Sequence, residues 1–137
     1  MAGPVSPSIS ARLIHAALVL GVVLFCLVAW AMGSAVPSEA LPNRRILYIS
    51  LTVVSATLFG AAAFTANRLA RPGRGNLAED WWRANLGRAV LIWALVEAPA
   101  MLGTIAYLLT RDFRALLAPF IGLLLFANYR PSRLTGS

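Results

Sequence analysis

The sequence is poor in charged and reactive side chains. It contains no lysine, one cysteine and one histidine, and only 12% of its 137 residues are charged, about half the share of an ordinary soluble domain. Cys26 cannot form an intrachain disulfide, and no group of Cys, His and carboxylate residues has the spacing of a metal site. No nucleophile–base pair or phosphate-cradling loop is evident. We therefore expect neither an enzyme nor a bound cofactor or metal.

What the sequence does contain is long apolar runs. Hydrophobic residues make up 59% of the chain, and the runs cover about residues 13–32, 46–66, 87–109 and 113–129. A helix needs about 20 apolar residues to cross a bilayer core, which the first three runs supply and the fourth approaches. The first run is longer than the apolar region of a signal peptide. We predict a single all-α domain over residues 1–137, an integral membrane bundle of four transmembrane helices running up-down-up-down.

The connections between these runs carry helix-breaking and interfacial residues. Pro72, Gly73 and Gly75 end the second run. The residues that follow predict a short interfacial helix from residue 77 into the third span, and its candidate lipid-interface side chains are Trp81, Trp82, Arg83 and Arg88. Anionic lipid headgroups are the expected partners; a cofactor site or lipid-specific site on this basic loop is the alternative.

A very short connection joins the third and fourth runs. It consists of Thr110, Arg111 and Asp112, so the two runs should be antiparallel neighbours. Asp112 is a candidate N-cap of the last helix.

The arginines predict the orientation in the membrane. All twelve basic residues are arginine, which is typical of a GC-rich bacterial genome, and they lie at the ends of the apolar runs rather than on one continuous face, so nucleic acid is not an expected partner. The side that holds both termini carries eight: Arg12, Arg68, Arg71, Arg74, Arg83, Arg88, Arg130 and Arg133. The opposite side carries four: Arg44, Arg45, Arg111 and Arg114. The positive-inside rule then predicts a multi-pass protein of the bacterial cytoplasmic membrane with both termini cytoplasmic.

One acidic residue lies inside a predicted span. Glu97 is near the centre of the third run, about 15 Å from either end at 1.5 Å per residue. An ionised carboxylate at that depth is costly, so Glu97 should be protonated, paired or in contact with water inside the bundle. Pro99 has no N–H, which leaves the carbonyl of Leu95 without its helical partner and allows a kink beside the acid.

The periodicity of the third run places Glu97 on a stripe that should face protein. At 100° per residue, this stripe contains Leu86, Val90, Trp93, Glu97, Ala100, Met101 and Thr104. The second run carries hydroxyls at a similar depth. Ser55, Thr52 and Thr57 are therefore the candidate partners of Glu97 in an ion- or proton-binding site.

Two resemblances bear on function. Residues 87–112, GRAVLIWALVEAPAMLGTIAYLLTRD, resemble the outer helix of the c and K proteolipid subunits of rotary ATPases, in which a carboxylate of similar context binds the transported ion. That resemblance implies an ion- or proton-carrying role for Glu97. The glycine-rich repeat of the rotor's inner helix does not occur in this chain. The whole chain also resembles small four-helix bacterial membrane proteins of uncharacterised function.

These patterns leave two classes of function open. The first is a structural or accessory membrane protein, in which Glu97 and Pro99 fix helix packing within a homo-oligomer or a larger membrane complex. The alternative is proton- or cation-coupled transport through Glu97. A Glu97→Gln substitution distinguishes them, because it keeps the size and hydrogen bonding of the side chain but removes its titration.

Overall fold

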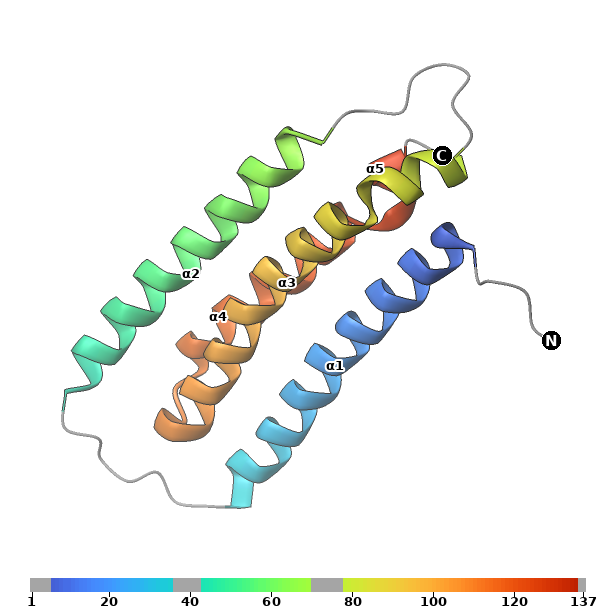
Figure 1. Ribbon diagram of the computed structural model, residues 1–137. Coiled ribbons are helices and arrows are strands. Elements are labelled where there is room, and N and C mark those ends of the chain that lie inside the picture. Colours follow the sequence, from blue (N-terminus) through green and yellow to red (C-terminus); the bar gives the residue numbers. More distant parts are fainter. Residues whose placement is uncertain (1–5, 36–42, 70–77, 136–137) are drawn as a thin grey trace.

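The computed structural model describes residues 6–35, 43–69 and 78–135, and every element of secondary structure in that part of the chain is a helix. Its elements are α1 (Pro7–Ala35), α2 (Arg44–Asn67), α3 (Ala78–Thr110), the 3₁₀ turn η1 (Phe113–Leu116), α4 (Leu117–Asn128) and α5 (Pro131–Thr135). Successive long helices run in opposite directions, so α5 lies at the same end of the bundle as the start of α1 (Figure 1).

Three helices are long and apolar enough to cross a membrane. They are Pro7–Gly33, Arg44–Asn67 and Ala78–Thr110. Large apolar side chains such as Leu13 and Ile46 stay more than half exposed on their outer faces, which suits contact with lipid rather than water. By helix length and hydropathy, this is a small multi-pass membrane protein.

The prediction of four transmembrane helices is wrong. The fourth apolar segment, Phe113–Asn128, is shorter than the three spans, and the 12 residues of α4 rise only about 18 Å against a hydrocarbon core of about 30 Å. Its first turn is 3₁₀ rather than α. At its other end, Pro131 disfavours helical backbone at the preceding residue, Arg130.

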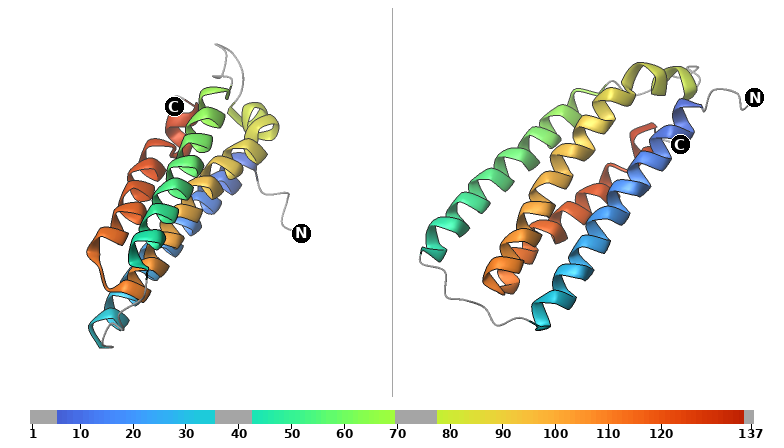
Figure 2. Two further views of the ribbon diagram at one scale, coloured as in Figure 1. Left: turned by 90° about the vertical axis from the view of Figure 1, so that its left-hand side faces the viewer. Right: turned by 60° about the horizontal axis from the view of Figure 1, so that its bottom comes forward.

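The predicted interfacial helix is not a separate element. Its first predicted residue, 77, lies outside the described residues, and the chain from Ala78 onward forms one continuous helix through to Thr110. The first turns of this helix bend across the end of the bundle (Figure 2, right). The chain continues through Pro99, which is buried within α3.

Helix α3 is the centre of the fold. It contacts α1, α2, η1 and α4, and Ile92, Trp93 and Val96 of this helix are fully buried. Phe126 of α4 is also in this core. The helix therefore has protein on several sides, whereas α1 and α2 keep broad lipid-facing surfaces.

A glycine sets the close approach of α3 to the segment that follows it. A Cβ atom at Gly103 would lie 2.7 Å from the Ala115 carbonyl oxygen, from Ala118 Cβ and from Pro119 Cδ. No larger residue fits there without moving backbone. The tight connection predicted at residues 110–112 is confirmed, and it makes α3 neighbour η1 and α4 as expected.

Candidate functional site

Glu97 lies on the stripe of α3 that faces protein. None of the seven residues of that stripe is exposed, and Glu97 itself is half-buried. Within the described part of the chain, no side chain donates a hydrogen bond to Glu97 and no arginine forms an ion pair with it. Its carboxyl therefore has no internal partner among those residues.

The stripe faces α1 and α4 rather than α2. Thr104 is the last residue of the stripe, about two helical turns beyond Glu97, and its Oγ1 is 3.2 Å from Sγ of Cys26 in α1. Trp93 lies one position above Glu97, and its ring centroid is 5.1 Å from that of His15, also in α1. Glu97 is thus flanked along α3 by two contacts to the same neighbouring helix.

The structure does not bring the predicted hydroxyl partners to Glu97. Thr52 and Thr57 are exposed, and each donates its hydroxyl proton to a carbonyl of its own helix, at 2.8 Å. Ser55 is buried, but its Oγ has no hydrogen-bond partner within the described residues. These side chains belong to α2, which packs on a different face of α3, and sequence periodicity does not reveal which helix covers which face.

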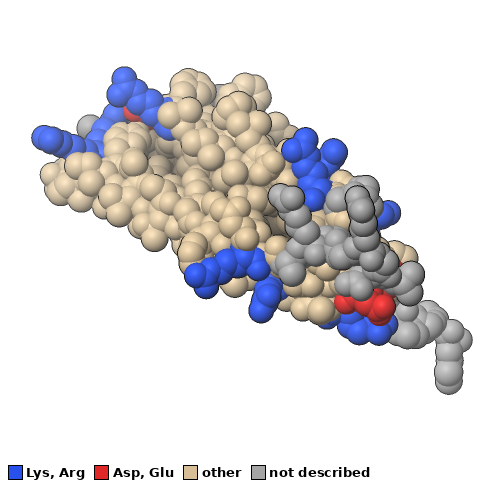
Figure 3. All heavy atoms as spheres, turned by 90° about the horizontal axis from the view of Figure 1, so that it is seen from above, with Lys and Arg blue, Asp and Glu red and all other residues tan. Residues whose placement is uncertain are grey.

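The candidate interfacial group divides into buried rings and exposed arginines. Trp81 and Trp82 are only 5% and 3% exposed, and their rings form an edge-to-face pair with centroids 4.9 Å apart. Their indoles therefore contact protein. Arg83 and Arg88 remain exposed, and Arg83 Nη1 lies 3.6 Å from a carboxylate oxygen of Asp80. Acidic side chains visible in Figure 3 likewise lie beside arginines, and most of the surface in view is uncharged.

A polar cluster that the sequence did not predict closes the C-terminal end of α4. Nε1 of Trp93 donates to the Tyr129 carbonyl at 2.8 Å, and Nε2 of His15 lies 3.0 Å from the Phe126 carbonyl oxygen. Because a carbonyl oxygen only accepts, His15 must carry its proton on Nε2. The last carbonyls of a helix have no partner within it, so α1 and α3 together supply donors that α4 lacks.

The two ends of α3 are also held by polar contacts. At its start, Glu79 accepts hydrogen bonds from the backbone N–H of Ser8, at 3.4 Å, and from the Ser8 hydroxyl. After its end, Asp112 is the N-cap of η1, as predicted, and accepts from the backbone N–H of Arg114 at 2.9 Å. That hydrogen bond is the main cause that lowers the pKa of Asp112 below its usual value, with smaller contributions from the Tyr48 hydroxyl and nearby arginines.

The side chains missed from the sequence share one property. His15, Trp93, Cys26 and Ser8 each contact a residue at least 36 positions away in the chain. The only available signal was the rule that every helix end leaves unpaired carbonyl or N–H groups, which predicts that donors will be needed but not which side chains supply them.

The described residues contain no group of three His, Cys, Asp or Glu side chains arranged to hold a metal ion. What the arrangement around Glu97 offers chemically is one titratable carboxyl at mid-membrane depth with partial exposure.

Comparison with protein-family models, curated proteins and solved structures gives no match. The fold and the helix lengths define the class, a small multi-pass helical membrane protein.

Proposed function

We propose that this protein is a structural or accessory component of the bacterial cytoplasmic membrane, with both termini cytoplasmic, and that it assembles with further membrane helices through Glu97. No enzymatic reaction and no cofactor is part of this proposal. The observation that carries it is the half-buried carboxyl of Glu97 without a partner in the described chain.

The cost of an unpaired carboxyl in hydrocarbon supports an external partner. Polar groups inside membranes almost always pair with one another or with backbone carbonyls, and interhelical hydrogen bonds of this kind contribute about 0.6 kcal/mol on average and up to about 2 kcal/mol. A protonated Glu97 at the edge of the α1–α3 contact can donate one such bond. The acceptor would come from a second copy of the chain or from another membrane protein.

Proton- or cation-coupled transport is the second candidate, because the same unpaired carboxyl is available to a proton. A single carboxyl is a poor cation site by itself, since hard cations take about six or more oxygen ligands. A proton is therefore the simpler cargo.

Two substitutions separate these functions. The wild-type chain, Glu97→Gln and Glu97→Leu are purified in mild detergent, and assembly size is measured by light scattering and cross-linking. Glutamine retains a hydrogen-bonding side chain, so Glu97→Gln should preserve assembly, whereas Glu97→Leu should weaken it about three- to ten-fold. Asp80→Asn, which changes an exposed acid near the start of α3, is the matched control and should behave as wild type.

Transport predicts a different pattern. If vesicles containing the wild-type protein carry a proton flux that Glu97→Gln lacks, and Glu97→Leu assembles normally, the structural role is refuted. Labelling by a lipid-soluble carbodiimide provides an independent measurement. The proposal has Glu97 protonated and partly exposed in separated chains, so it should react there, and assembly should protect it. Equal labelling in both states would contradict assembly through this residue.

A further inference from the structure

A groove lies between α2 and the segment formed by η1 and α4. Its volume is about 570 Å³, within the usual range of small-ligand sites, about 300–1,000 Å³. One stripe of α2 lines it: Tyr48, Leu51, Thr52, Ser55, Ala56 and Phe59. Arg114, Ala115, Leu117, Ala118 and Ile121 line the opposite wall. The two walls lie beside each other in Figure 2 (left).

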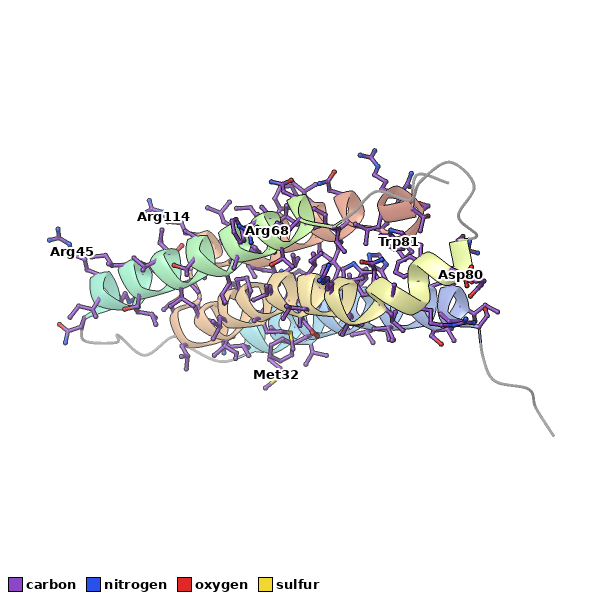
Figure 4. All side chains as sticks on the ribbon, turned by 45° about the horizontal axis from the view of Figure 1, so that its top comes forward. Met32, Arg45, Arg68, Asp80, Trp81 and Arg114 are labelled. Carbon is purple, nitrogen blue, oxygen red and sulfur yellow. The ribbon has the colours of Figure 1, made fainter. Side chains whose placement is uncertain are left out.

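The groove has one polar end and is otherwise mainly apolar. Arg114 lies at the end that also contains Tyr48, and its side chain is exposed. Figure 4 shows Arg114 and Arg45 pointing outward at the same end of the bundle. The described acid of this end, Asp112, is ionised and interacts electrostatically with Arg114 and Arg44. The end nevertheless carries four arginines, Arg44, Arg45, Arg111 and Arg114, against that one described carboxylate, so its net positive charge attracts an anion.

The length of the groove matches one leaflet of a bilayer. From Tyr48 to Phe59 the helix rises about 16 Å, and half of the hydrocarbon core is about 15 Å. A molecule with its charged group beside Arg114 and an apolar chain reaching Phe59 would extend from the interface to the bilayer centre. A transmembrane helix, about 10 Å wide with its side chains, is too bulky to lie within a groove of this volume.

We propose that this groove is a binding site for an anionic phospholipid. The phosphate binds at the Arg114 guanidinium, and one acyl chain lies between α2 and α4, along Ala56, Ala118 and Phe59. The site is separate from Glu97, which faces α1, and does not depend on its role.

Native mass spectrometry of the full chain tests the site. The protein, in mild detergent, is given equal amounts of phosphatidylglycerol and phosphatidylcholine. The wild-type chain should retain one phosphatidylglycerol in preference to phosphatidylcholine. Arg114→Gln should reduce that preference roughly five-fold, which corresponds to about 1 kcal/mol for one arginine near a lipid surface. Arg45→Gln removes an exposed charge at the same end without touching the groove and should leave the preference unchanged.

A second pair of variants tests the apolar part. Ala56→Phe fills the groove and should remove the bound lipid, whereas Ala17→Phe places the same ring on an exposed position of α1 and should not. Equal retention of the two lipids by the wild-type chain, or undiminished retention by Ala56→Phe, would overturn the proposal. A change from dimer to monomer in Ala56→Phe would also overturn the proposal, because the occupant of the groove would then be a second copy of the chain.

A measurement without substitution covers the case in which Ala56→Phe does not fold. Phosphatidylglycerol carrying a photoreactive group near the end of one chain is cross-linked to the wild-type protein. Labelled peptides should come from α2 and α4. Labels confined to α1 would refute the site.

Discussion

The indole Nε1 of Trp93 donates a hydrogen bond of 2.8 Å to the carbonyl of Tyr129, 36 positions later in the chain. His15 donates to the neighbouring open carbonyl of Phe126, and its ring lies edge-on to both Trp93 and Phe126. Three helices thus meet at the end of α4. This contact explains how a helix too short to cross the membrane is held in a defined position against α1 and α3.

Replacing Trp93 by Phe should destabilise the protein. The substitution keeps a large ring but leaves the Tyr129 carbonyl without its donor, which should lower the free energy of unfolding by about 1–2 kcal/mol. Thermal unfolding in detergent measures the effect. Trp30→Phe changes a ring that is 59% exposed and should have almost no effect; equal losses in the two variants would contradict the assigned role of Trp93.

Gly103→Ala should destabilise the contact of α3 with η1 and α4. The added methyl group would approach three atoms to 2.7 Å, one of them a backbone oxygen, and overpacking of this kind costs about 1–3 kcal/mol. Gly21→Ala is the matched control, because nothing lies within 4 Å of its added Cβ. That control should be neutral or stabilise α1 by up to about 1 kcal/mol. Equal behaviour of the two variants in denaturant titrations would show that the close approach is absent.

Asp112 should make stability depend on pH in the acid range. Its pKa in the folded protein lies below the ordinary value, chiefly because it accepts the Arg114 backbone N–H. The ionised carboxylate therefore stabilises the fold above the pKa of the unfolded chain, about 3.9, and this contribution is lost as pH falls through the folded pKa.

The measurement is the difference in melting temperature between wild type and Asp112→Asn from pH 7 to pH 3. Asparagine still caps a helix but does not titrate, so the wild-type chain should lose stability relative to the variant below about pH 4. A difference that stays constant over the whole range would exclude this linkage.

Glu79→Ala should loosen the start of α1. The carboxylate of Glu79 accepts from both the backbone N–H and the hydroxyl of Ser8, in the first turn of α1, where N–H groups have no partner in the helix. Faster hydrogen exchange over the first turn of α1 is the expected result. Asp80→Ala, at the adjacent exposed position, should leave that exchange unchanged, and an equal effect would argue against the Ser8 contact.

Much of the fold was predictable because apolar length and turn chemistry are local properties. The three long spans, the tight connection before Phe113 and the Asp112 cap all follow from residues close together in the chain. The fourth span was overestimated because a 17-residue apolar run gives no sign that its first turn is 3₁₀. Composition did not predict that the interfacial segment would be continuous with α3. It also did not predict that Trp81 and Trp82 would be buried.

The site was predictable only in part. Periodicity identified the stripe of α3 that faces protein, and each of its residues is buried or half-buried. It could not tell that α1 and α4, rather than α2, pack against that stripe. The hydroxyls of Ser55, Thr52 and Thr57 in α2 were therefore predicted to be partners of Glu97, although a different face of α3 packs on α2.

By itself, the sequence determined that this chain belongs in a membrane and that one carboxyl, Glu97, lies deep in its third apolar run. Both follow from the sequence because hydropathy and spacing depend only on the order of the residues. Only the tertiary structure decided which helices are neighbours, which carbonyls His15 and Trp93 satisfy, and that a groove remains between α2 and α4. The physical reason is that apolar helix faces are interchangeable as hydrophobic surfaces. Their pairing is selected by close packing at residues such as Gly103 and by hydrogen bonds between distant positions.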